Sequence, residues 1–119
     1  MRTAWPILLA LTACATAPHA SQPSSCLIRD ENLQPMQCFD FVGPQSRAYG
    51  PQTCREMEGR PEYVPNLSCS DEGLVGSCTT GAGSDTEVVE RCYRDPDECR
   101  ARCKRHAGTF APVAAAPSP

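Results

Sequence analysis

The chain has 119 residues, 9 cysteines, 12 prolines, 6% aromatic residues and a formal charge of −3. This length allows one small domain. The cysteine count argues against an ordinary cytosolic enzyme, because the cytosol keeps thiols reduced. The weak net charge gives no reason to expect a nucleic acid partner. After the first thirteen residues, no apolar run approaches the length of a membrane span.

Residues 1–13 have the features of an export signal. Arg2 supplies positive charge, residues 4–11 are mostly apolar, and two small residues, Thr12 and Ala13, follow. The apolar stretch is too short to cross a bilayer as an ordinary helix. We therefore expect this segment to be a signal peptide that is removed.

The signal ends in Leu11-Thr12-Ala13-Cys14, an aliphatic residue, two small residues and a cysteine. This stretch resembles the lipobox of bacterial lipoproteins. The resemblance implies that a diacylglyceryl group alkylates the Cys14 thiol and that a peptidase then cleaves before Cys14. It also implies sorting to the outer membrane, because Ala15 is not acidic. The alternative is ordinary cleavage after Ala15, which would give a secreted protein without an anchor.

The cysteine count supports either kind of export. Nine is an odd number, and an unpaired thiol in an exported protein needs a reason. Loss or modification of Cys14 leaves eight cysteines, which can pair fully as disulfides. These are Cys26, Cys38, Cys54, Cys69, Cys78, Cys92, Cys99 and Cys103.

The mature chain divides by composition into three parts. Residues 14–25 are rich in small residues, Ser and Pro and are predicted to be a lipidated flexible tether. Residues 111–119 are predicted to be a disordered tail. The folded domain is therefore placed at 26–110. Its few large apolar residues make a marginal core, which disulfides worth about 2–4 kcal/mol each would reinforce.

A repeated pattern predicts two short helices. Each copy has a Pro, then a Cys followed five positions later by Gly, then an aromatic residue; the pairs are Pro51/Pro96, Cys54/Cys103, Gly59/Gly108 and Tyr63/Phe110. Pro suits the first turn of a helix, and Gly suits the left-handed residue that ends one. We expect helices at 51–58 and 96–107, the second capped by Asp95 with Glu98 three residues later.

Three strands are predicted, at 36–42, 74–79 and 86–93. The turn-rich segment 80–85 makes 74–93 a β-hairpin. The predicted fold class is a small disulfide-rich α+β domain, built from two short strand–helix units that are cross-linked to each other.

Residues 54–110 also resemble small cysteine-rich bacterial lipoproteins of unassigned function. The resemblance rests on Leu74-Val75-Gly76-Ser77-Cys78, a following strand with Val88, Val89 and Tyr93, and a helix that ends near Cys103, Gly108 and Phe110. In this chain Cys92 stands where a second aromatic residue is usual, so Cys92 and Cys99 are expected to form an extra local bridge. The resemblance brings no catalytic residues.

The pairing of the eight cysteines stays a hypothesis at this stage. If the strand cysteine bonds to the helix cysteine in the same way in both units, the pairs are Cys38–Cys54 and Cys78–Cys103. Cys92–Cys99 and Cys26–Cys69 are then left as the remaining pairs.

Metal binding and catalysis have weak signals. No Cys-x-x-Cys is present, and His19 and His106 are the only histidines, so disulfides are favoured over a zinc site, and no metal or cofactor is expected. His106 follows Cys103 by three residues and could approach it across a helical turn, which leaves a hydrolase as a weak hypothesis. We expect Cys103 to be oxidised and the protein not to be an enzyme.

Charge is divided unevenly along the domain. Residues 26–90 are acidic, whereas residues 91–110 carry an excess of bases. Arg100, Lys104 and Arg105 should point to water from the second helix. They are candidates for contact with anionic lipid or cell-wall polymer. The alternative is a solvated helix whose bases favour its own dipole.

Two functions of different classes follow. The first is a lipid-anchored cell-envelope protein with a structural or binding role, whose partners are the membrane and either an envelope protein or an anionic polymer. The second is a secreted disulfide-rich inhibitor or ligand module, for which residues 43–50 are the best candidate for an exposed loop.

Overall fold

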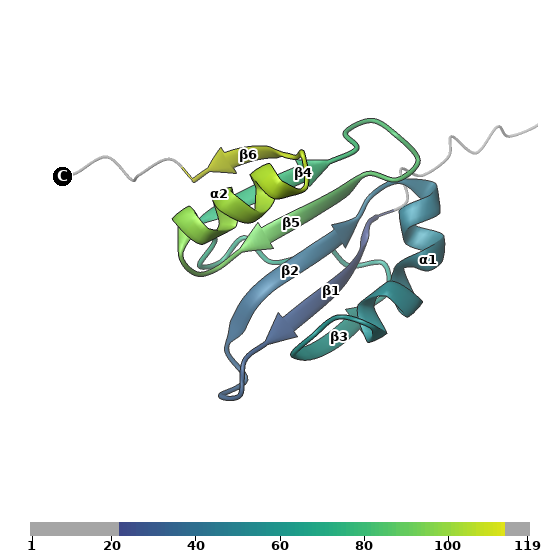
Figure 1. Cartoon of the computed structure of the whole chain (residues 1–119). Coiled ribbons are helices and arrows are strands. Elements are labelled where there is room, and N and C mark those ends of the chain that lie inside the picture. The colour runs from purple at the N-terminus through teal and green to yellow at the C-terminus, as the bar shows by residue number, and fades with distance from the viewer. Residues whose placement is uncertain (1–21, 114–119) are drawn as a thin grey trace, which may run out of the picture.

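The computed structural model describes residues 22–113, which form a six-stranded antiparallel sheet with two helices (Figure 1). Both helices pack on the same face of the sheet (Figure 1). The predicted small α+β class with two strand–helix units is confirmed. No helix in this part of the chain is long and apolar enough to cross a membrane.

Each half of the domain has the order strand, strand, helix, strand. The first half contains β1 (Ser24–Arg29), β2 (Pro35–Phe41), α1 (Pro44–Arg55) and β3 (Arg60–Val64). The second half contains β4 (Gly76–Thr80), β5 (Val88–Cys92), α2 (Pro96–Arg105) and β6 (Thr109–Pro112). The strands lie in the order β3-β1-β2-β5-β4-β6, so β2 and β5 join the two halves at the centre.

The strand registers show that the halves are structural repeats. Cys26 lies opposite Phe39 on one side and Tyr63 on the other. Cys78 lies opposite Glu90 and Phe110 in the same way. Phe39 and Glu90, which are equivalent by this register, also lie opposite each other across the β2–β5 boundary. An approximate two-fold axis therefore passes between them, and the sequence repeat corresponds to a repeat of structure.

One disulfide in each half ties the helix to the first strand. These bonds are Cys26–Cys54 and Cys78–Cys103. Cys92–Cys99 links β5 to α2, and Cys38–Cys69 links β2 to the segment between the halves. Cys78–Cys103 and Cys92–Cys99 were predicted correctly. The other two predicted pairs were wrong, because Cys54 bonds to Cys26 of β1, a strand that the sequence analysis missed, and not to Cys38.

The cystines make up most of the core. Within residues 22–113, the buried apolar residues are the eight cysteines together with Ile28 and Phe41. Phe39, Met57 and Tyr63 pack partly buried against this group. With so few large apolar side chains buried, the disulfides supply cross-links of about 2–4 kcal/mol each that the core does not provide.

The helix boundaries differ in part from those predicted. α2 begins at Pro96, and the Asp95 side chain accepts a hydrogen bond from the backbone N–H of Glu98, as predicted. α1 begins at Pro44 and carries Pro51 in its interior, so the prediction of a helix starting at Pro51 was wrong. Residues 43–50 therefore form the start of a helix and are not the exposed loop that we expected.

The expected limits of the domain also move outward. β1 includes Ser24 and Ser25, which we had placed in the tether, and β6 includes Ala111 and Pro112, which we had placed in the tail. Both segments pair with strands that lie further inside the sheet. The described residues thus include a folded part that begins earlier and ends later than predicted.

Candidate functional site: a groove beside the linker

Residues 65–75 link the two halves and are anchored to the face of the sheet opposite the helices. Cys38 lies beside Leu27 and Arg91 in the sheet, on the face that Cys26 does not share. The Cys38–Cys69 disulfide fixes the middle of the linker to this face. The linker is therefore fixed to the sheet by a covalent bond near its centre.

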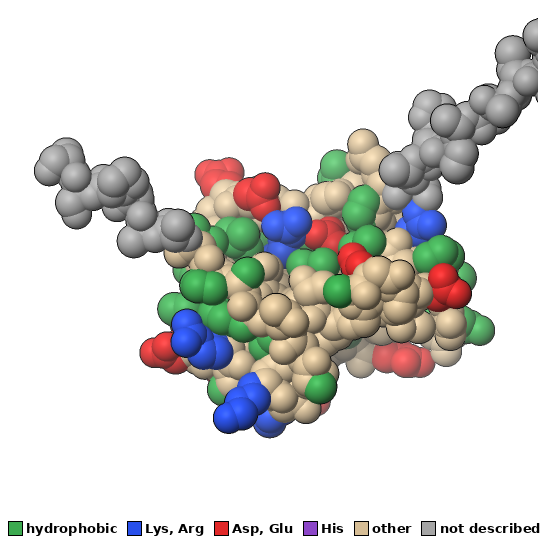
Figure 2. All heavy atoms as spheres, turned by 90° about the horizontal axis from the view of Figure 1, so that it is seen from above, with side chains coloured by type: hydrophobic (Ala, Val, Ile, Leu, Met, Phe, Trp, Pro, Cys, Tyr) green, Lys and Arg blue, Asp and Glu red, His purple; other side chains and the backbone are tan. Residues whose placement is uncertain are grey.

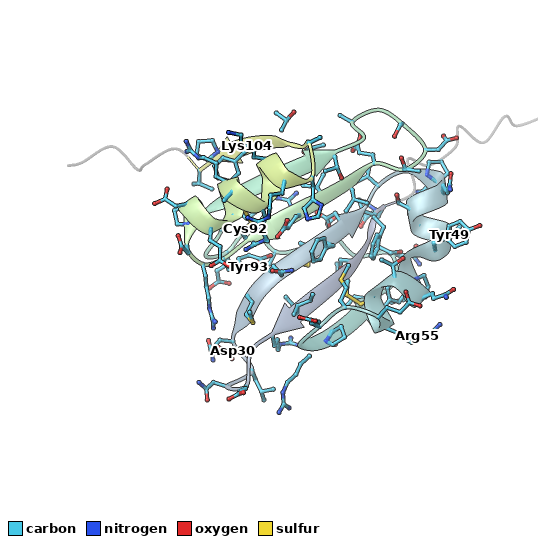
Figure 3. The ribbon with its side chains drawn as sticks, in the orientation of Figure 1. Asp30, Tyr49, Arg55, Cys92, Tyr93 and Lys104 are labelled. Atoms are coloured by element: carbon cyan, nitrogen blue, oxygen red, sulfur yellow. A yellow bond between two sulfur atoms is a disulfide. The ribbon has the colours of Figure 1, made fainter. Side chains whose placement is uncertain are left out.

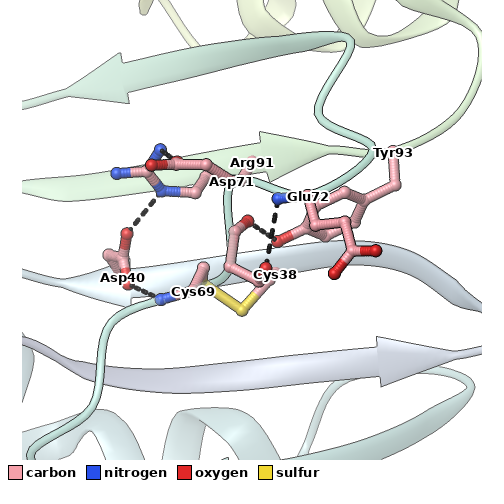
Figure 4. A network of polar contacts seen from close by, with 8 residues as sticks. Cys38, Asp40, Cys69, Asp71, Glu72, Arg91 and Tyr93 are labelled. Atoms are coloured by element: carbon pink, nitrogen blue, oxygen red, sulfur yellow. Dashed lines mark hydrogen bonds and ion pairs between the residues drawn. A yellow bond between two sulfur atoms is a disulfide. The ribbon is translucent and has the colours of Figure 1, made fainter.

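A polar network holds the linker on both sides of this disulfide (Figure 4). Asp40, which is 2% exposed, accepts a hydrogen bond from the backbone N–H of Cys69 at 2.7 Å. Its other oxygen accepts from Nε of Arg91 at 2.8 Å, and Arg91 also donates to Asp71 of the linker at 2.6 Å. The buried carboxylate is thus paired with a cation and a backbone amide, which a buried charge requires.

Tyr93 closes one end of the network. Its hydroxyl donates a hydrogen bond to the backbone carbonyl of Ser70 at 2.7 Å. Burial raises the pKa of the Tyr93 hydroxyl above its ordinary value of 10.0. The phenol is therefore held in the neutral form that donates this bond.

A groove of about 970 Å³ lies between the linker and β1. Its apolar surface comes from Leu27, Val64, Leu67, Tyr93 and the Cys38–Cys69 disulfide. Ser25 lies opposite Val64, so these two residues mark one end, and Tyr93 with Arg94 marks the other. The volume falls within the range of about 300–1,000 Å³ typical of ligand pockets.

One buried polar group opens into this groove. Ser25 is only 3% exposed and lines the groove wall. By the strand registers, its equivalent in the second half is Ser77. The Ser25 hydroxyl can donate to a ligand that supplies an acceptor at this end of the groove.

A second cavity, of about 460 Å³, lies on the helix side near the two-fold axis. Phe39, Phe41 and Met57 form its apolar surface, and the ion pair between Glu90 and Arg102 forms part of its wall. Arg102 donates to one Glu90 oxygen through both Nε and Nη2, at 3.1 and 2.9 Å. Because the Glu90 and Arg102 charges are paired with each other, we take the linker groove and not this cavity as the candidate binding site.

The bases of the second half divide into two groups. Arg91, Arg94 and Arg102 form ion pairs with acids. Arg100, Lys104 and Arg105, the predicted contact residues, are exposed and have no ion pair within the described part of the chain, although the Arg100 guanidinium lies 5.0 Å from the Phe110 ring centre. Figure 3 shows Lys104 on the outer side of α2. Figure 2, which views the molecule from above, shows both acidic and basic side chains on that face.

The sulfur atoms of the described residues are not available as nucleophiles. Cys103 is bonded to Cys78, so His106 has no thiol beside it to activate. Glu90, Cys92 and Cys99 cluster closely enough to hold a metal ion, but the two sulfurs are bonded to each other. A metal needs thiolate sulfur, so this cluster does not suit one while the disulfide is intact.

The structure locates only some of the residues singled out from the sequence. All eight predicted disulfide cysteines and the three exposed bases of α2 lie within the described residues. The signal peptide, Cys14 and His19 lie outside them. Sequence reasoning missed the groove and Asp40, for which the one signal was an acid placed between two phenylalanines, Phe39 and Phe41.

The chain matches no known protein family, no curated protein and no solved structure with which it was compared. Its function therefore has to be argued from its own residues.

Proposed function

We propose that this chain is an exported cell-envelope protein, anchored in a membrane by lipid on Cys14, with a structural or binding role and no enzymatic one. The observation that carries the proposal is the complete pairing of the other eight cysteines. Cys14 therefore has no cysteine of its own chain left to pair with. It stands directly after Leu11-Thr12-Ala13, the stretch that resembles a lipobox.

The cystine core supports the exported location. Four disulfides form and persist in oxidising compartments and are rare where glutathione keeps thiols reduced. In the reduced chain, the buried residues would be thiols around only two large apolar side chains, Ile28 and Phe41. The domain therefore depends on an oxidising space for its stability.

The lipid would be attached through the Cys14 sulfur. That sulfur would form a thioether with the glyceryl group of a phospholipid, whose phosphate-bearing headgroup would leave with the thiol proton. Hydrolysis of the peptide bond between Ala13 and Cys14 would then release the signal peptide. Two or more acyl chains give stable anchoring, because each buried CH₂ contributes about 0.8 kcal/mol.

A binding role is favoured by the exposed surfaces of the domain. The linker groove offers an apolar surface with the Ser25 hydroxyl at one end. The outer side of α2 offers Arg100, Lys104 and Arg105, whose charges are not neutralised by ion pairs within residues 22–113. Each such base near an anionic surface contributes about 1 kcal/mol, so the anchored domain would rest α2 against anionic lipid or cell-wall polymer.

The proposal is tested by Cys14→Ala, with Thr12→Ser as the control that keeps a small residue in the lipobox-like stretch. In the host, the wild type and Thr12→Ser should sediment with membranes and incorporate labelled fatty acid. Cys14→Ala should lose the label and should leave the wild-type membrane fraction. Unchanged membrane association of unlabelled Cys14→Ala would contradict the proposal. An unmodified wild-type chain that begins after Ala15 would favour the secreted alternative.

A further inference from the structure

We propose that the groove beside the linker shelters one acyl chain of the protein's own anchor whenever that chain is outside a membrane. This inference rests on the proposed lipidation of Cys14. The proposed occupant is the lipid carried by the N-terminal segment.

The groove has the shape and surface that a single acyl chain requires. It extends beside β1 from Ser25 and Val64 to Tyr93, because Ser25 is near the start of that strand and Tyr93 donates its backbone N–H to Met36 near the start of β2. Leu27 of β1 and the Cys38–Cys69 disulfide lie between these ends. An unbranched hydrocarbon buries apolar surface along such a floor without requiring hydrogen bonds there.

The polar groups give the direction in which the chain would lie. The Ser25 hydroxyl is a hydrogen-bond donor on the wall of the groove, in a residue that is only 3% exposed. The ester carbonyls beside the lipidated cysteine are acceptors that it could bond. The headgroup end would therefore lie at Ser25, and the hydrocarbon would run toward Tyr93.

The connectivity of the chain places the anchor at that same end. Ser25 is the second residue of β1, and Cys14 precedes it by eleven residues. Eleven residues reach up to about 40 Å when extended, which exceeds the distance needed to enter a groove that starts at Ser25. Because the lipid and the groove belong to one chain, their encounter is intramolecular and is favoured over capture of a free lipid.

A substitution at Leu67 can test the groove without disturbing the fold, because this side chain is exposed. It is 57% exposed and lines the groove, whereas Leu33 is 60% exposed at the tip of the first hairpin and does not. Leu67→Asp should therefore damage the groove, and Leu33→Asp is its matched control. In the same way, Ser25→Ala removes the hydroxyl at the end of the groove, and Ser77→Ala is the control at the equivalent position of the second half.

The first experiment titrates the full chain carrying Cys14→Ala with N-acetyl-S-dodecylcysteine methyl ester, a soluble mimic of the lipidated residue. Calorimetry should show saturable binding of one probe per chain. Leu67→Asp should weaken binding about tenfold and Ser25→Ala about fivefold, while both controls bind like the parent. Absence of saturable binding, or equal losses in variants and controls, would overturn the inference.

The second experiment asks whether the protein's own lipid occupies the groove. Lipidated protein in detergent-free buffer should not bind the probe, and its Leu67→Asp variant should expose the lipid and aggregate. Probe binding by the lipidated protein as strong as by the unlipidated chain would overturn the inference. The mass of the mature chain separates the two proposals: an acylated Cys14 with no probe binding refutes only this inference, whereas an unacylated Cys14 refutes the proposed function.

Discussion

Asp40 and Arg91 occupy equivalent positions in the two halves of the sheet and form an ion pair across the boundary between them, at 2.8 Å. The repeat therefore carries opposite charges at one position of its two copies. This difference serves the linker, because Asp40 also binds the Cys69 amide and Arg91 also binds Asp71. The two halves have diverged where a single linker has to be held.

Arg91→Met should lower the free energy of unfolding by about 3 kcal/mol, because it leaves the buried Asp40 carboxylate without its cation. Urea unfolding gives the value. The matched control is Arg29→Met, which removes the exposed pair with Glu62 and should cost less than about 1 kcal/mol. Similar losses in the two variants would contradict the role given to Asp40 and Arg91.

The structural repeat also predicts that the packing found in the first half can replace the Cys92–Cys99 disulfide. Cys92 is equivalent to Phe41, and Cys99 is equivalent to Gly50, where a Cβ atom would come within 2.8 Å of the Phe41 ring. Cys92→Phe with Cys99→Gly should therefore fold and copy the packing of the first half. The double variant loses a disulfide that closes a short loop, so we expect a lower free energy of unfolding by about 2 kcal/mol.

Single variants provide the control for this replacement. Cys92→Phe alone keeps the Cys99 side chain in the space that the ring needs, so it should be less stable than the double variant. Thermal unfolding followed by circular dichroism compares the two. A double variant that is no more stable than Cys92→Phe would show that the two halves do not share this packing.

Tyr93 should make the free energy of unfolding fall with rising pH in the alkaline range. Burial raises the pKa of its hydroxyl, so the unfolded chain loses this proton at lower pH than the folded one. The stability that this group contributes is fully present below about pH 10 and is lost as the pH rises through the folded pKa. The free energies of unfolding of the wild type and Tyr93→Phe, measured from pH 8 to pH 11, should therefore converge at high pH. Tyr49→Phe, an exposed control, should run parallel to the wild type.

The bases of α2 predict binding to anionic membranes. Lys104→Ala with Arg105→Ala should reduce co-sedimentation of the unlipidated chain with phosphatidylglycerol vesicles by about tenfold or more. Arg55→Ala with Arg60→Ala removes the same charge from exposed positions of the first half and should have little effect. Equal losses in both double variants would indicate attraction by net charge alone, and the α2 surface would then have no special role.

The sequence predicted the second half better than the first, for local reasons. Asp95, Pro96 and Glu98 lie together as a cap and a helix start, and the structure uses them in that way. In the first half, Pro51 looks like a helix start although Pro44 is the one that begins α1. A Pro within a helix interior is costly, and tertiary contacts, here the Cys26–Cys54 disulfide, override that preference.

The missed strands explain the wrong disulfides and the missed groove. β3 contains Pro61 and is an edge strand, a place where Pro is tolerated but its sequence signal is weak. β1 begins with two serines, so only Cys26, Leu27 and Ile28 give an apolar signal in it. Because β1 was not predicted, Cys54 was paired with Cys38 of the predicted strand 36–42, and Cys26 was left for Cys69. The groove depends on where the linker crosses the sheet, which is a relation between distant residues that no local pattern encodes.

The end of α2 also shows what a local sequence pattern can and cannot predict. Gly108 was expected as the left-handed residue after α2, but Ala107 has the positive φ of 54°. Gly108 is needed for a different reason, because a Cβ atom there would clash with the sulfurs of Cys78 and Cys103. The sequence pattern identified the position as one that needs glycine, and the structure supplies the cause.

The most direct test of the account is the intact mass of the mature protein isolated from its host, measured without reduction. The account predicts a chain that begins at Cys14, carries the mass of the acyl groups, and lacks the two hydrogens that each of its four disulfides removes. A chain with the eight downstream cysteines as free thiols, or one that carries no acyl mass, would contradict it.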